Sequence, residues 1–254
     1  MQTSFFNDAP LWALLLLIFG SLCLTAFVGA KLRGRLSPDP DDNASEGYLL
    51  SATLALLGLL IGFTFSMALA RYDTRREMVV AEANAIGTAW LRAGLVDGAP
   101  GETLRKSLRD YGEQRLKLPQ SADADAAEST TAALQARVWA DMRAALPTMQ
   151  QPIAATLVGA INEMFDDASS RRAERDARIP GLVLDILVVC VLTAGAMVGY
   201  VLGGASGRRH ATVTGLLFLL LALAMTMILD LDRPWSGLVQ VPQEPMVLAV
   251  AAMR

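Results

Sequence analysis

The sequence predicts an all-α fold, with four membrane-spanning helices and a helical soluble region between the second and third spans. The chain has 254 residues, of which 53% are hydrophobic and 19% charged, an apolar excess beyond that of ordinary soluble domains. Charge is also unevenly spread, because four stretches, residues 11–30, 48–70, 179–201 and 211–229, contain a single charged residue, Asp185. About 27% of the remaining residues are charged, which is normal for a surface in water.

Each of the four stretches is about 20 residues long, which lets an α-helix cross the roughly 30 Å hydrocarbon core. The first is not typical of a signal peptide, because no positive side chain precedes it and its apolar run is too long. An even number of crossings places both termini and residues 71–178 on one side of the membrane. The short loops are basic, which predicts a cytoplasmic position for them, but seven arginines flank residues 71–178. The sequence therefore leaves the side undecided.

Residues 71–178 show helical periodicity without strand alternation. The helix of the second span is predicted to continue to about residue 97, and further helices are predicted over 102–118 and 129–145. A polar linker over 121–128 separates those two, and the capping-box spacing of residues 148–151 predicts the start of a fourth helix. The apolar stripes of these helices need partners, which leaves open a four-helix unit, intersubunit helices or a surface for a partner protein.

The tail, residues 230–254, contains Pro242 and Pro245, which predict no continuous helix before about residue 246. Its apolar side chains fit either the soluble helices or the membrane surface. The two cysteines, Cys23 and Cys190, lie within spans, where we expect buried thiols and neither a disulfide nor a metal site.

Several sequence runs carry a resemblance to a known family: residues 62–73, 82–92 and 230–245, and more weakly 161–164 with 178–180. In this order they resemble the bestrophin-like domain family of bacterial membrane proteins. That family is named for a distant similarity to bestrophins, which are pentameric ion channels with four membrane helices per subunit and a helical region between spans two and three. The resemblance implies a homo-oligomer in the bacterial inner membrane, although no bestrophin pore motif transfers residue by residue. Bestrophins place the helical region in the cytosol, against the short-loop interpretation.

The second span carries a stripe of small residues: Ser51, Ala55, Gly58, Gly62, Ser66 and Ala70. Small residues at this spacing let helices approach closely in lipid, which by itself predicts plain helix packing. The alternative is that the span lines a central pore, with an apolar constriction that closes by dewetting. The pore candidates are Leu59, Gly62, Phe63, Phe65 and Ser66, and the sequence does not decide which phenylalanine points inward.

Charged residues are expected to meet where the second span ends, the third begins and the fourth ends, at one membrane face. We call this set the polar junction: Arg71, Asp73, Arg75, Arg178, Asp185, Asp230, Asp232 and Arg233. A charge within a span needs a partner or water, and Arg71 is the predicted partner of Asp185, with Arg178 and Arg233 as competitors. The junction is either a structural salt-bridge network or a charged vestibule that selects ions.

The sequence offers no nucleophile–base pair, phosphate loop or metal cluster, so no enzyme activity, cofactor or metal is expected. The acidic isoelectric point, near 5.3, argues against a nucleic-acid partner. The first functional hypothesis is an oligomeric, channel-type membrane protein whose partners are lipid, further copies of the chain and inorganic ions. The alternative is a non-conducting scaffold or signalling protein whose helical region binds a partner.

Overall fold

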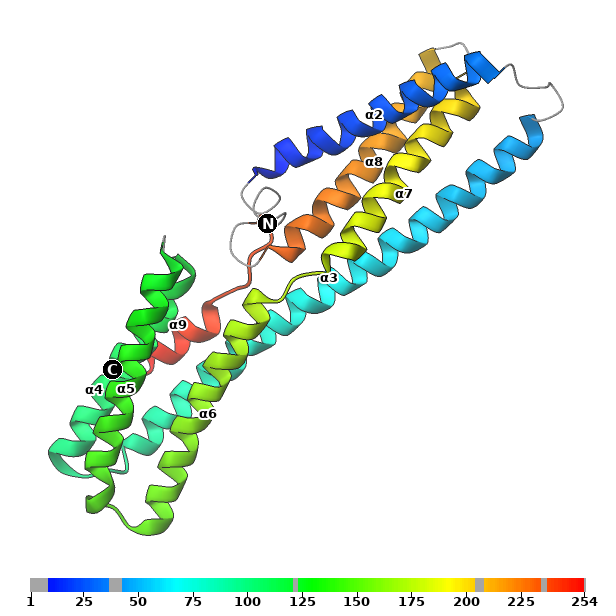
Figure 1. Ribbon diagram of the computed structural model, residues 1–254. Helices are drawn as coiled ribbons and strands as arrows, with labels where there is room; N and C mark the ends of the chain where they lie inside the picture. Colours follow the sequence, from blue (N-terminus) through cyan, green and yellow to red (C-terminus); the bar gives the residue numbers. More distant parts are fainter. Residues whose placement is uncertain (1–8, 37–42, 121–122, 204–207, 234–236, 254) are drawn as a thin grey trace. The chain divides into compact units, whose positions relative to one another are not determined.

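The computed structural model describes residues 9–36, 43–120, 123–203, 208–233 and 237–253 and contains no strand within them. Its α-helices are α2 (Leu11–Leu36), α3 (Asn43–Ala93), α4 (Gly98–Lys117), α5 (Ala124–Ala145), α6 (Gln151–Asp176), α7 (Gly181–Leu202), α8 (Arg208–Asp232) and α9 (Glu244–Ala251) (Figure 1). The chain divides into two compact units. The membrane unit comprises residues 1–72 and 178–240, and the helical unit comprises residues 73–177 and 241–254.

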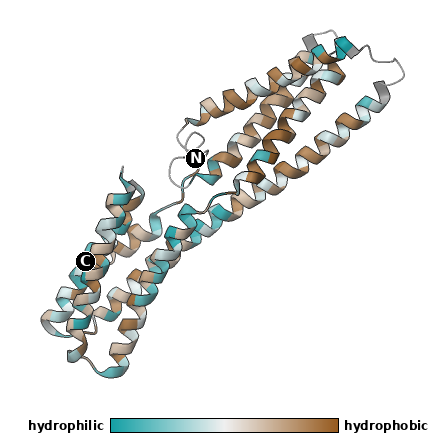
Figure 2. Cartoon of the chain, in the orientation of Figure 1, coloured by the Kyte–Doolittle hydropathy of each residue, from teal (hydrophilic) through white to brown (hydrophobic). Residues whose placement is uncertain are grey.

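Four helical segments are long and apolar enough to cross a membrane, which confirms the predicted all-α, four-span fold. They include α2, α8 and the apolar parts of the long helical segments that contain α3 and α7, and hydrophobic residues dominate these regions in Figure 2. Because α3 runs without a break from Asn43 to Ala93, the second span continues directly into the helical unit, as its uninterrupted helical pattern predicted.

In the membrane unit, α2 packs closely against α7 through glycines. A Cβ atom added at Gly29 would come within 3 Å of the backbone of Ala196, and one at Gly199 within 3 Å of the backbone of Ala26. Backbones can approach this closely in lipid only where side chains are absent. The glycines therefore set the spacing of the two helices. Both cysteines are free, and Cys23 is exposed on the chain rather than buried as predicted.

The helical unit has a core of its own, formed by the second half of α3 together with α4, α5, α6 and α9. Its fully buried side chains include Ile86, Leu108, Tyr111, Met142 and Leu157. The amphipathic stripes predicted over this region therefore find partners within a single chain.

The start of α5 corrects the predicted linker. The helix begins at Ala124, and the carboxylate of Asp123 caps it by accepting a hydrogen bond from the amide of Ala126 at 3.0 Å. An aspartate at this position satisfies an otherwise free amide, so residues 124–128 are helical. Residues 121 and 122 of the predicted linker lie outside the described part of the chain.

The start of α6 shows that the predicted capping box was wrong. The helix begins at Gln151 with Pro152 in its first turn, where the fixed φ of proline suits a helix. The Thr148 hydroxyl instead donates to the carbonyl of Ala145 at 2.7 Å. Spacing alone did not reveal that a preceding 3₁₀ turn, Leu146–Thr148, already uses that hydroxyl.

The C-terminal segment belongs to the helical unit. Its helix, α9, starts at Glu244, two residues before the predicted limit, because Pro245 lies in the first turn, where its missing N–H costs nothing. Met246 of α9 is fully buried in the core, and the Arg109 guanidinium donates to the carbonyl of Met253. Of the two predicted positions for the tail, the structure has the one against the soluble helices.

Candidate functional site

The predicted pore residues lie on the outer face of α3. The face turned toward the rest of the membrane unit carries Leu57, Thr64 and Ala68, which are 1%, 4% and 0% exposed. The pore candidates are all exposed on the single chain: Leu59, Gly62, Phe63, Phe65 and Ser66. Together they leave a largely apolar surface of α3 that the chain itself does not cover.

The two phenylalanines differ in direction, which the sequence did not resolve. Phe63 is 64% exposed and Phe65 is 37% exposed. Two residues correspond to about 200° around an α-helix, so the two rings point to different sides. Phe63 lies next to Leu59 on the outermost side, whereas Phe65 lies closer to the buried face of Leu57 and Thr64. Of the two rings, only Phe63 is directed away from the chain's own bundle.

The glycines of the α3 stripe have no role in packing this chain. A Cβ added at Gly58 or Gly62 would meet no atom within 4 Å, in contrast to Gly29 and Gly199 at the α2–α7 contact. A glycine inside a helix costs about 1 kcal/mol relative to alanine. Packing within the chain therefore does not explain these two glycines.

In the membrane unit, Asp230 at the end of α8 binds backbone amides rather than arginines. It is 2% exposed and accepts hydrogen bonds from the amides of Leu238 at 2.8 Å and Val239 at 3.1 Å. A Cβ at Gly237 would come within 3 Å of the carboxylate. Glycine is needed there because the chain must close tightly over Asp230.

The second aspartate of this motif joins the end of α8 to the start of α7. The Asp232 carboxylate accepts from the amide of Ile179 at 3.0 Å, and the Arg178 guanidinium donates to the Asp232 carbonyl at 3.3 Å. Arg233, beside it, is 5% exposed. The structure thus brings together four predicted junction residues, Arg178, Asp230, Asp232 and Arg233. The bonds of Asp232 join the end of α8 to the segment before α7.

The predicted pairing of Asp185 with Arg71 is wrong. Asp185 is exposed and has no ion pair or hydrogen bond within the described part of the chain, and the Nε atom of Arg71 has no hydrogen-bond partner there either. The physical reason is helical direction: the packed face of α7 contains Leu187 and Val191, and Asp185 lies about 200° around the helix from Leu187. Its carboxylate therefore faces out of the chain.

Two further junction residues, Asp73 and Arg75, belong to the helical unit. Arg75 is 5% exposed, and its guanidinium donates to the carbonyls of Glu174 at 3.2 Å and Ala177 at 2.8 Å. These carbonyls close the C-terminal end of α6, where a cation is favourable. Asp73 is exposed. Arg75 is therefore a capping residue of α6.

The most buried charges of the helical unit were missed by the sequence analysis. Glu82 of α3 is fully buried and binds two arginines, Arg115 of α4 and Arg171 of α6, the latter at 2.7 Å. Arg171 also donates to the side-chain oxygen of Gln243, just before α9, at 2.7 Å. One carboxylate thus joins three helices directly and the C-terminal segment through Arg171.

Electrostatics keep Arg115 of this cluster charged. Burial works against the charged form of Arg115, but the charge and hydrogen bond of Glu82 hold the pKa of its guanidinium above the usual range. Burial also raises the pKa of the nearby Tyr111 phenol to about 12. A local signal for Glu82 existed, because it lies on the same helical stripe as Val79 and Ile86, where an acid must be paired. Its partners had no local signal.

Comparison with known proteins identifies a family and several solved structures that this chain resembles. The model of the bestrophin-like domain family matches residues 16–246, and a search of curated proteins found no match. Among solved structures, the chain resembles a bacterial bestrophin homologue from Klebsiella pneumoniae, with a TM-score of 0.67 and 13% identity over 96% of this chain and 97% of that one. A substituted form of that homologue has a TM-score of 0.72 and 11% identity, over 94% of this chain and 97% of that one. A structure described as a membrane protein has a TM-score of 0.70 and 12% identity, over 96% of each chain.

The fold and its apolar helices define a multi-pass helical membrane protein with an additional helical unit. The chain belongs to the bestrophin-like domain family, because the family model covers most of its length. At these low identities, the structural matches show that the chain shares the fold of those proteins.

Proposed function

We propose that the chain is a subunit of a homo-oligomeric ion channel in the bacterial inner membrane, with the first half of α3 around the pore. The observation that carries this proposal is the uncovered outer face of α3, where Gly58 and Gly62 contact nothing in their own chain. Membership of the bestrophin-like family supports it. Five copies, as in the bestrophins the family is named for, are the proposed number.

The proposed constriction is formed by Phe63, with Leu59 one turn before it and Ser66 nearly one turn after it. Apolar rings around a narrow pore exclude water and so block ions until the pore widens. Small residues such as Gly62 and Ser66 let neighbouring α3 helices approach closely.

The polar junction divides into two parts under this proposal. Asp230 and Asp232 bind backbone amides, which supports the structural interpretation for them. Asp73 and Asp185 are exposed carboxylates, and they are the members that remain for contact with ions.

The test is ion conductance of the purified protein in planar bilayers, together with its native mass. We expect a closed oligomer that conducts, with Phe63→Ala changing conductance or gating and Phe65→Ala, the matched control on the other side of α3, having little effect. A monomer would refute the proposal, and a silent oligomer would favour the non-conducting scaffold. Unchanged currents for Phe63→Ala would remove the constriction.

A further inference from the structure

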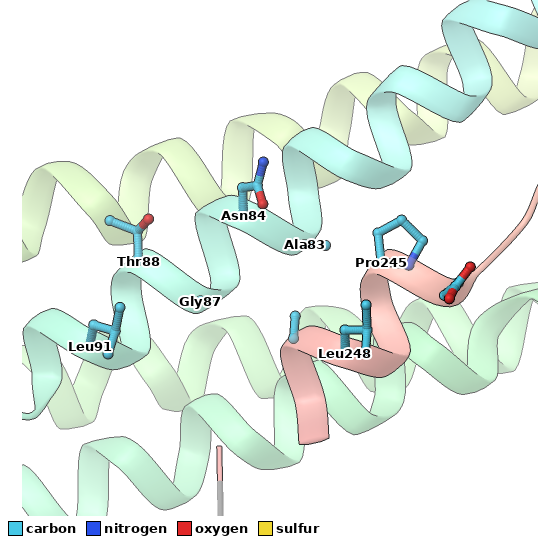
Figure 3. Close-up of a pocket in the computed structure, with 9 residues that line it drawn as sticks. Ala83, Asn84, Gly87, Thr88, Leu91, Pro245 and Leu248 are labelled. Atoms are coloured by element: carbon cyan, nitrogen blue, oxygen red, sulfur yellow. The ribbon is translucent and has the colours of Figure 1, made fainter. Parts of the chain in front are cut away.

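A groove on the helical unit lies between α3 and α9 (Figure 3). It has a volume of about 650 Å³ and is lined by Asn84, Gly87 and Leu91 of α3 and by Glu244, Pro245 and Leu248 of α9, among others. The two leucines are 68% and 62% exposed. In a unit outside the membrane spans, an exposed apolar surface of this kind is typical of a site that binds another protein.

Nothing in its own chain completes the groove. A Cβ at Gly87 would meet no atom within 4 Å. The amide side chain of Asn84 is exposed and has no hydrogen bond within the described residues. The groove therefore has room for a closely packed helix, and its polar lining includes the Asn84 amide, Thr88 and Glu244.

A second free surface lies on α6, on the opposite side of α3. The α3 side chains that bind α6 include Glu82, bound to Arg171, and Arg92, which donates to the carbonyl of Thr156. Arg75, which caps α6, is a third. Glu82 is about 200° around the helix from Asn84 of the groove. The outer face of α6 consists of small or short polar residues, all exposed: Ala155, Gly159, Asn162, Asp166 and Ser170. Gly159, like Gly87, meets nothing within 4 Å.

We infer that the α3–α9 groove of one copy receives the outer face of α6 of the next copy. This inference rests on the proposed function, since it requires the oligomer. Two different surfaces on opposite sides of one unit make a head-to-tail contact, which closes into a ring when the rotation permits. A second copy of this chain is the occupant because its own α6 matches the groove in side-chain size and in hydrogen bonding.

In a ring, the subunits are related by rotation about one axis, so a given residue lies at the same height along that axis in every copy. Residues that face each other between copies must therefore lie at similar heights. With α3 lining the pore, the contacts within one unit fix the heights: Glu82 is level with Arg171, and Arg92 with Thr156. Residue numbers rise along α3 as they fall along α6. Two residues at the same height, one on each helix, therefore have numbers that add up to about 250.

This register makes the facing pairs complementary. Leu91, a large side chain, faces Gly159, and the Asn84 amide faces the Asp166 carboxylate. Size and hydrogen bonding thus agree in one register.

The test is disulfide cross-linking of full-length protein in membranes, with Cys23→Ala and Cys190→Ala as the background. The matched pairs are Leu91→Cys with Gly159→Cys, and Asn84→Cys with Asp166→Cys. We expect oxidation to convert the monomer band into a ladder that ends at the closed ring. The mismatched pair Asn84→Cys with Gly159→Cys, seven residues of α6 out of register, or about 10 Å, is the control and should remain monomeric.

The outcomes separate this inference from the proposed function. A closed oligomer by native mass in which neither matched pair cross-links overturns the inference alone. Equal cross-linking of matched and mismatched pairs overturns the register. A monomeric protein overturns both the inference and the channel proposal.

Discussion

Replacing Glu82 by alanine leaves the guanidinium groups of Arg115 and Arg171 buried without the carboxylate that they share. The three side chains are 0%, 2% and 10% exposed, so water does not replace the lost partner. Arg171 keeps its bond to Gln243, but two like charges then remain close together inside the helical unit. The substitution should therefore destabilise this unit strongly.

The expected loss is about 3–5 kcal/mol, the usual cost of removing one partner from a buried ion pair. For a chain of this size each kcal/mol lowers the melting temperature by about 2–4 °C, so a fall of roughly 6–20 °C is expected. The matched control is Glu77→Ala on the same helix, because Glu77 is exposed and has no ion pair within the described residues. Its effect should stay within about 0.5 kcal/mol.

The assay is thermal denaturation of the purified protein in detergent, followed by circular dichroism and by fluorescence of Trp90 and Trp139, which lie in the helical unit. Changing Glu82, Arg115 and Arg171 together to methionine should restore much of the loss, because no buried charge is then left unpaired. If Glu82→Ala melts within about 2 °C of Glu77→Ala, which corresponds to less than about 1 kcal/mol, the buried cluster does not hold the unit together.

Two further predictions concern pH and close packing. Because the pKa of Tyr111 is about 12 in the folded chain against 10.0 normally, the neutral phenol favours folding below pH 10, and up to about 3 kcal/mol is lost as pH rises toward 12. Tyr111→Phe should therefore flatten the fall in melting temperature between about pH 9 and 11, and equal slopes would contradict the raised pKa. Gly199→Ala forces a Cβ into the backbone of Ala26 and should cost about 1–3 kcal/mol. Gly58→Ala has open space and should leave folding of the isolated chain intact or slightly better, so equal losses in thermal denaturation would refute the assigned packing.

Most of the fold was predictable because its signals are local. Hydropathy marked the spans, and the unbroken helical pattern after residue 70 predicted the long α3, which ends at Ala93. A proline or a capping side chain shifts a helix end by a few residues, as Pro152 and Asp123 do. Such shifts depend on which backbone groups are already bonded, and spacing does not contain that information.

The polar sites were less predictable because their partners are distant or lie on the backbone. Matching opposite charges suggested Arg71 for Asp185, whereas Asp230 and Asp232 bind amides of Leu238, Val239 and Ile179. Sequence gives every residue but proline an amide, so it does not reveal which amide lies near. The Glu82 cluster joins residues 33 and 89 positions apart, beyond any helical periodicity.

The glycines show how structure separates two causes that look alike in sequence. Gly199 is required by its own chain, whereas Gly58 and Gly62 are not. Gly20 and Gly215 also meet nothing within 4 Å. Neither of those two has another glycine within one turn. On α3 the uncovered glycines are one turn apart in a stripe of small residues, so a neighbouring helix can approach there. This grouping of uncovered small residues, rather than any one glycine, therefore favours a neighbouring helix beside α3.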